Sequence, residues 1–117
     1  MKKILVICGP TATGKTALAL SLAKKFNGEV LSADSRQVYI GMDIGTGKDL
    51  PKNTRKFKDH YEINGIKLWG YDLVDARAPF SVAQYVTYAK KTVKKIVSRG
   101  HVPILVGGTG LYIKGVI

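Results

Sequence analysis

The sequence is poor in cysteine and contains no long hydrophobic run. A single cysteine, Cys8, cannot form a disulfide within the chain and is typical of a reducing compartment such as the cytoplasm. No apolar stretch approaches the roughly 20 residues that a membrane helix needs, so a membrane-spanning segment is not expected. Internal repeats and low-complexity tracts are also absent. The 117 residues are therefore expected to form one domain with a modest core.

Acidic residues are scarce as well. Eight Asp and Glu stand against nineteen Lys and Arg, which gives a formal net charge of +11. This balance predicts attraction to polyanions, with nucleic acid the leading candidate. Much of the excess lies in residues 48–58 and in residues 90–99. The alternative is a basic surface that serves only solubility.

Histidine is rare, and neither of the two residues is predicted to be catalytic. His60 is flanked by polar residues and is expected to be exposed. His101 lies just beyond an expected helix, where a cation interacts favourably with the helix end.

The most informative stretch that is present fits the phosphate-binding pattern G-x-x-x-x-G-K-[ST]. Its members are Gly9, Pro10, Thr11, Ala12, Thr13, Gly14, Lys15 and Thr16. The glycines permit a tight turn whose amide groups face an anion. Lys15 adds a positive charge at the outer phosphates, and the Thr16 hydroxyl can bind Mg²⁺. The motif predicts a nucleotide or diphosphate ligand and does not choose between them.

Hydrophobic patterning around this loop predicts an α/β, P-loop NTPase-like three-layer fold with a parallel sheet. The expected strands are 3–8, 29–33 and 103–106, with a hairpin across 61–69 that turns at Asn64-Gly65. One helix is expected after the loop, with an apolar stripe of Leu18, Leu22 and Phe26 and with Ala19 and Ala23 beside them. A second helix is expected from the cap Ser81 to about Ser98. About three parallel strands and a hairpin are fewer than the roughly five parallel strands usual for this fold. We therefore expect residues 1–117 to be a phosphate-binding domain truncated at its C-terminus.

Beyond the third expected strand, a residue that nucleotide hydrolases usually carry is missing. An aspartate commonly stands there, whereas this chain has Gly107. Asp34 follows the second strand and is expected on the same rim as the phosphate loop, because ligands of open α/β sheets bind beyond the carboxyl ends of the strands. There it can act as a general base or hold a metal through water. Alternatively, Asp34 or Ser35 caps a helix.

Four blocks of sequence, in this order and spacing, closely resemble one family. They are Gly9–Thr16, Asp34-Ser35-Arg36-Gln37-Val38-Tyr39, Asp43-Ile44-Gly45-Thr46 and Val106-Gly107-Gly108-Thr109-Gly110-Leu111-Tyr112. The family is that of the tRNA dimethylallyltransferases, also called tRNA isopentenyltransferases. The resemblance covers essentially the whole chain but only the amino-terminal part of a typical member. Residues 55–75 match loosely, and the later half, with a helical tRNA-gripping insertion and a further arginine, is absent.

The resemblance implies transfer of a dimethylallyl group from dimethylallyl diphosphate to N6 of an adenine beside the tRNA anticodon. The phosphate loop, with Lys15, Thr16 and a bound Mg²⁺, would hold the diphosphate as it leaves. Asp34 matches the family's catalytic aspartate and would accept a proton from the attacking amine. The positions that would meet the anticodon stem-loop are Asp34, Ser35, Arg36, Gln37 and Thr109. Two alternatives stay open: an ATP-binding small-metabolite kinase, and an inactive phosphate-binding fragment.

Overall fold

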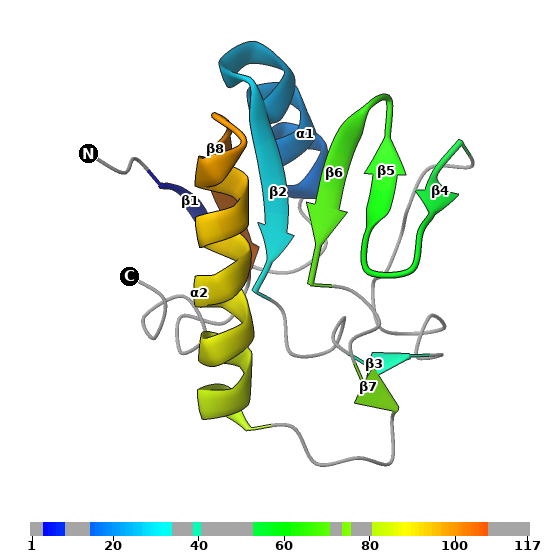
Figure 1. Ribbon diagram of the computed structural model, residues 1–117. Coiled ribbons are helices and arrows are strands. Elements are labelled where there is room, and N and C mark those ends of the chain that lie inside the picture. Colours follow the sequence, from blue (N-terminus) through cyan, green and yellow to red (C-terminus); the bar gives the residue numbers. More distant parts are fainter. Residues whose placement is uncertain are drawn as a thin grey trace.

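The computed structural model describes residues 4–8, 15–33, 39–40, 53–70, 74–75 and 81–107. Their elements, in chain order, are β1 (Leu5–Cys8), α1 (Lys15–Phe26), β2 (Gly28–Ser32), β3 (Tyr39–Ile40), β4 (Arg55–Lys56), β5 (Tyr61–Ile63), β6 (Ile66–Trp69), β7 (Val74–Asp75), α2 (Val82–Ser98) and β8 (Val102–Gly107). Six strands form one sheet in the order β1-β8-β2-β6-β5-β4, and β3 pairs with β7 separately (Figure 1).

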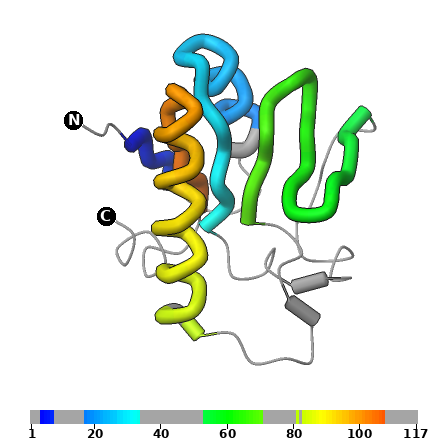
Figure 2. The backbone as a smooth tube through the Cα atoms, in the orientation of Figure 1, coloured from blue at the N-terminus to red at the C-terminus, as the bar shows by residue number. Residues whose placement is uncertain are grey.

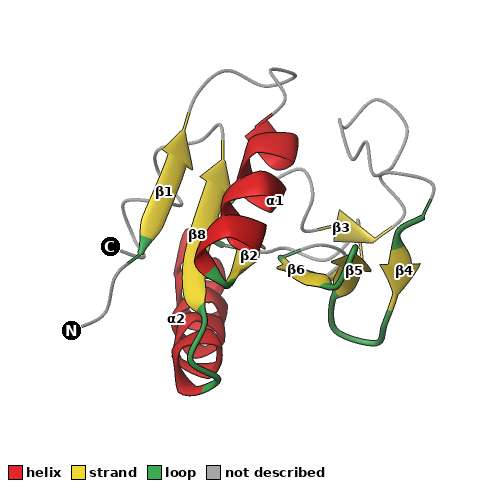
Figure 3. Ribbon diagram, turned by 90° about the horizontal axis from the view of Figure 1, so that it is seen from above, coloured by secondary structure: helices red, strands yellow, loops and turns green. Residues whose placement is uncertain are grey.

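Two helices cover opposite faces of the large sheet (Figure 3). Alternate residues of the central strands point to opposite sides, so each face has its own apolar cluster. On the α1 side, Val30 and Ile104 pack with the small helix residues. On the α2 side, Leu31 and Leu105 pack with Tyr85 and its neighbours. The predicted three-layer α/β fold is thereby confirmed.

Helix α1 meets the sheet through the two alanines predicted beside the apolar stripe, and not through the larger residues at both ends of that stripe. Ala19 and Ala23 are fully buried, whereas Leu18 is 51% and Phe26 is 47% exposed. Two alanines four residues apart lie on one helical face and let the helix axis approach the strands closely. The leucine and phenylalanine expected in the core are therefore rotated toward solvent, and this part of the prediction was wrong.

Helix α2 follows its predicted course. Ser81 caps it: the Ser81 hydroxyl accepts from the Gln84 amide at 3.1 Å, and the Ser81 amide donates to the Gln84 side chain at 2.7 Å. This reciprocal capping box fixes the first turn. The buried stripe consists of Tyr85, Ala89, Thr92, Val93 and Ile96. The four lysines at 90, 91, 94 and 95 are exposed, as expected.

The predicted hairpin is present, and it contributes more to the sheet than the sequence indicated. Strands β5 and β6 pair antiparallel around Asn64-Gly65, whose φ angles of 52° and 81° suit a two-residue hairpin turn. Strand β6 then pairs in parallel with β2, with Val30 opposite Leu68. The described sheet thus has four parallel strands, β1, β8, β2 and β6, rather than three. Figure 2 shows this hairpin extending the sheet beside β2.

Candidate functional site

Three parallel strands end at one edge of the sheet. In the parallel pairing, Cys8 at the end of β1 lies opposite Gly107 at the end of β8, and Ser32 at the end of β2 lies opposite Val106. In sheets of this kind, ligands bind beyond such carboxyl ends. The edge formed by the ends of β1, β8 and β2 is therefore the candidate site.

Two of the predicted phosphate-binding residues lie at the start of a helix. Lys15 and Thr16 are the first two residues of α1, which follows β1 in the chain. The first turn of α1 contains no acidic residue, so no carboxylate of that turn competes for the positive end of the helix dipole. The remaining predicted residues lie outside the described part of the chain: Gly9, Pro10, Thr11, Ala12, Thr13, Gly14, Asp34, Ser35, Arg36, Gln37 and Thr109.

The backbone that leads into Asp34 is held from two sides. On one side, the Ala33 amide donates to the Val106 carbonyl oxygen at 2.7 Å, which extends the contact with β8 by one residue. On the other, the hydroxyl of the fully buried Tyr85 donates to the Ser32 carbonyl oxygen at 2.7 Å. The last residues before Asp34 thus have their direction fixed by a strand and a helix together.

Close backbone contacts support the same segment. A Cβ atom on Gly107 would lie 2.7 Å from the Ala33 carbonyl oxygen, and one on Gly70 would lie 2.6 Å from the Ser32 carbonyl oxygen. Gly70 also has a φ of +93°, which side-chain-bearing residues rarely adopt. Its amide donates to the Tyr88 hydroxyl at 3.1 Å. Burial raises the pKa of Tyr88, so this hydroxyl stays protonated. Only glycine fits at either position without displacing the backbone before Asp34.

The phenol hydroxyls of Tyr85 and Tyr88 were not among the site groups predicted from the sequence. The missed signal was a tyrosine within an apolar helical stripe, because a buried phenol hydroxyl needs a hydrogen-bond partner. From the sequence, Gly107 stood out for the aspartate it replaces and, with Gly108, for leaving room for a substrate close to the backbone. The structure adds that this glycine allows the close approach of β8 to Ala33.

A second polar group lies toward the opposite end of β2. The side chain of Glu29 is 2% exposed and accepts from Arg99 at 2.7 and 2.8 Å, from Trp69 at 2.8 Å, and contacts the His101 ring nitrogen at 2.6 Å. Burial alone raises the pKa of Glu29, but the hydrogen bonds from these partners outweigh it and lower that pKa to about 2. Because Glu29 belongs to the start of β2, we assign this cluster a structural role. His101 is thus a partner of Glu29 as well as a residue near a helix end.

The environment of His60 also differs from the prediction. Its side chain is 12% exposed, so the expectation of an exposed histidine was wrong. The ring stacks on Phe57 at 4.9 Å and on Trp69 at 4.7 Å, centroid to centroid. Its polar sequence neighbours gave no sign of these aromatic contacts.

Comparisons with known proteins agree with this architecture. A family model described as IPP transferase matches residues 37–117. The chain belongs to the IPP transferase family. It is 50% identical to tRNA dimethylallyltransferase 1 of Syntrophus aciditrophicus over 119 residues, and 46% identical to tRNA dimethylallyltransferase of Leuconostoc citreum over 117 residues. The predicted family resemblance is confirmed.

Solved structures of the family have the same fold. The tRNA isopentenylpyrophosphate transferase of Bacillus halodurans superposes with a TM-score of 0.87 at 44% identity, and that of Staphylococcus epidermidis with 0.86 at 45% identity. Both are matched over the whole of this IPP transferase chain and over 36% of their own length. The Syntrophus and Leuconostoc relatives are likewise covered to 36% and 37%, so the chain spans little more than a third of the proteins it matches.

Two features of the described residues bear on possible partners. No described helix is long and apolar enough to cross a membrane. The described residues also contain no group of three or more histidine, cysteine, aspartate or glutamate side chains that could hold a metal ion.

Proposed function

We propose that this chain carries the diphosphate-binding part of a tRNA dimethylallyltransferase, which transfers a dimethylallyl group to N6 of an adenine next to the tRNA anticodon. The observation that carries the proposal is whole-chain similarity to proteins of that name, at 50% and 46% identity. A structural relative described as a eukaryotic dimethylallyltransferase acting on tRNA adds a TM-score of 0.85 at 36% identity.

In the proposed reaction, the N6 amine attacks the first carbon of the dimethylallyl group. The bond from that carbon to the diphosphate oxygen breaks, and diphosphate leaves with the electron pair. Negative charge grows on the diphosphate as the bond lengthens, so positive groups held in place beforehand lower the barrier. We assign this role to Lys15, to the amides of the 9–14 loop and to the N-terminus of α1.

The proton released by the amine needs an acceptor. We propose Asp34 as the general base, since a carboxylate within hydrogen-bond reach of the amine can accept it. The fixed direction of Ser32 and Ala33 supports this role, because the chain enters Asp34 from an anchored strand end. Ser35, Arg36, Gln37 and Thr109 are proposed to contact the anticodon stem-loop, with Asp34 at the target base.

The donor chemistry of the proposed site fits Mg²⁺, which binds one or two protein oxygens together with phosphate oxygens and water. Thr16 would supply the protein oxygen from the first turn of α1. When bound, the ion would offset the charge of the diphosphate. The described residues contain no cluster of acidic side chains, and this arrangement does not need one. The diphosphate itself would supply most of the oxygen atoms that bind Mg²⁺. We also propose a cytoplasmic location, in keeping with the single cysteine.

Ligand competition tests the proposal. Calorimetric titration with dimethylallyl diphosphate and with ATP, each with Mg²⁺, is expected to show tighter binding of dimethylallyl diphosphate. Much tighter binding of ATP would instead favour the small-metabolite kinase. Binding of neither would indicate an inactive fragment.

The role of Asp34 is tested in the protein expressed from its complete reading frame. Asp34→Ala is expected to lower the rate of dimethylallyl transfer to tRNA by about 10²- to 10⁴-fold, the usual contribution of a general base. Binding of the diphosphate is expected to survive, since the phosphate loop is unchanged. A variant with the parent rate would remove Asp34 from the mechanism.

A further inference from the structure

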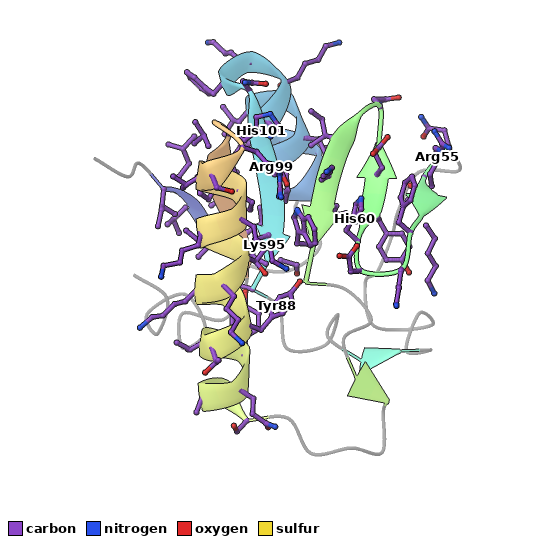
Figure 4. All side chains as sticks on the ribbon, viewed as in Figure 1. Arg55, His60, Tyr88, Lys95, Arg99 and His101 are labelled. Atoms are coloured by element: carbon purple, nitrogen blue, oxygen red, sulfur yellow. The ribbon has the colours of Figure 1, made fainter. Side chains whose placement is uncertain are left out.

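A column of flat side chains runs across the α2 side of the β6–β5–β4 part of the sheet. Its members, in order, are Arg99, Trp69, His60, Phe57 and Arg55. The Arg99 guanidinium lies 5.5 Å from the Trp69 ring centroid, and the Arg55 guanidinium lies 5.4 Å from the Phe57 ring centroid. Between them, His60 stacks on Trp69 at 4.7 Å and on Phe57 at 4.9 Å. We call this group the stacked column; Figure 4 labels Arg99, His60 and Arg55.

The two ends of the stacked column differ in exposure. At the inner end, Trp69 is buried and Arg99 is bound to Glu29. At the outer end, Phe57 remains 38% exposed and Arg55 is exposed on β4. Phe57 lies between the His60 ring and the Arg55 guanidinium, and its exposed part and this guanidinium together form the outer end of the column. Both groups are surfaces on which nucleobases stack.

Charge around the outer end favours an anionic partner. Residues 55–59 contain three cations, Arg55, Lys56 and Lys58, and one acid, Asp59. The acid is already engaged, since its carboxylate contacts the His60 ring nitrogen at 2.7 Å. The hydrogen bond from His60 lowers the pKa of Asp59, which therefore stays ionised as the partner of the ring. An exposed aromatic ring in a segment with more cations than acids is the pattern of single-stranded nucleic-acid sites.

The outer end also lies on the same edge as the candidate site. The Phe57 amide donates to the His60 carbonyl oxygen at 2.8 Å and closes the turn before β5. Strand β5 begins at Tyr61, which pairs with Leu68 near the end of β6, so this turn lies where β6 and β2 end (Figure 1). From β2 to β4 there are three strand spacings, or about 14 Å. Stacked nucleotides rising about 3.4 Å each would cover that span with about four residues.

We infer that the exposed end of the stacked column, Phe57 and Arg55, is a stacking site for an unpaired base of single-stranded RNA. The cations at 55, 56 and 58 would meet the neighbouring phosphates. This inference rests on the proposed function, because the natural ligand would be the substrate tRNA. One of its loop nucleotides would lie at Phe57 and Arg55 while another is at Asp34.

The test uses a dye-labelled single-stranded RNA of about 10 nucleotides, a length within the usual site size. Its affinity for the full 117-residue chain is measured by fluorescence anisotropy at several salt concentrations. Phe57→Leu is expected to weaken binding by about tenfold, within the range seen when one base loses its aromatic partner. Its salt dependence is expected to match the parent, because no charge is removed.

A matched control exists on the opposite edge of the sheet. Phe26, the last residue of α1, is 47% exposed, and the Lys25 ammonium lies 5.5 Å from its ring centroid. Phe26→Leu is expected to keep the parent affinity within about twofold. Arg55→Gln is expected to weaken binding and to reduce the slope of log affinity against log salt by about 0.7, the value for one phosphate contact on a single strand.

Three results would overturn the inference. They are equal affinities of the Phe57→Leu and Phe26→Leu variants, duplex RNA binding as tightly as the single strand, and no RNA binding by the parent. Circular dichroism checks folding, and Phe57→Met replaces the leucine variant if that one is unfolded. Calorimetric binding of dimethylallyl diphosphate is measured in the same samples. If dimethylallyl diphosphate still binds while Phe57→Leu leaves RNA affinity unchanged, the inferred stacking site is wrong and the proposed function is unaffected.

Discussion

Replacing Glu29 by glutamine should remove a large share of the stability of this domain. The carboxylate links β2 to Trp69 on β6, to Arg99 at the end of α2 and to His101 before β8. Its pKa of about 2 lies well below the ordinary 4.5. A difference of about 2.5 pKa units, at about 1.36 kcal/mol each, corresponds to about 3 kcal/mol of folding free energy. Glutamine has the size of glutamate but lacks the charge that pairs with Arg99. Glu29→Gln should therefore lower the unfolding free energy at pH 7 by about 3 kcal/mol.

The sign of the pH dependence follows from the lowered pKa. Because the folded protein holds Glu29 ionised more strongly than the unfolded chain does, its stabilisation is fully present above about pH 5. It is lost progressively as the pH falls from about 5 toward 2. The difference in unfolding free energy between the parent and Glu29→Gln should therefore shrink over this interval.

Urea unfolding followed by circular dichroism and by the emission of Trp69, the single tryptophan, measures these differences. Glu62→Gln is the matched control, since Glu62 is half-buried on β5 opposite Lys67. It should change stability by no more than about 0.5 kcal/mol. A loss below about 1 kcal/mol for Glu29→Gln at pH 7 would refute the reasoning. So would a parent–variant difference that stays constant between pH 5 and pH 3.

Two further predictions concern the segment before Asp34. Tyr85→Phe removes the 2.7 Å hydrogen bond to the Ser32 carbonyl and should cost about 1 kcal/mol in urea unfolding; an unchanged midpoint would contradict this. Gly107→Ala places a Cβ 2.7 Å from the Ala33 carbonyl oxygen and should destabilise by about 1–3 kcal/mol. A melting temperature equal to that of the parent would contradict this, since it would mean that β8 can move away from Ala33 without loss of stability.

Local elements of this fold were predictable because neighbouring residues specify them. The Ser81–Gln84 capping box, the turn at Asn64-Gly65 and the run before the phosphate loop each depend on a few adjacent side chains. The face of α1 was not predictable in the same way. Leu18 and Phe26 are more hydrophobic than Ala19 and Ala23, but the close approach of the helix to the sheet favours the alanines.

The sequence predicts the type of the candidate site but not the contacts that hold the strand ends beside it. Lys15 and Thr16 were predicted from a motif in which the spacing of glycines, lysine and threonine is the one that phosphate binding needs. The contacts of Tyr85 with Ser32, and of Gly70 with Tyr88, join residues 53 and 18 positions apart. Such contacts depend on where α2 crosses the strands, which no local pattern encodes.

The sequence by itself determined the family and the order of the longer strands and helices along the chain, and it predicts a phosphate loop, because each is recognised from short runs of neighbouring residues. The short strands β3, β4 and β7 were not predicted. The tertiary structure decided which distant residues meet. The strand order β1-β8-β2-β6-β5-β4 places Glu29 beside Arg99, 70 residues away, and aligns Phe57, His60 and Trp69 in one column. The physical reason is that sheet order results from packing the whole chain around a common core, whereas propensity and motif describe only a few neighbouring residues at a time.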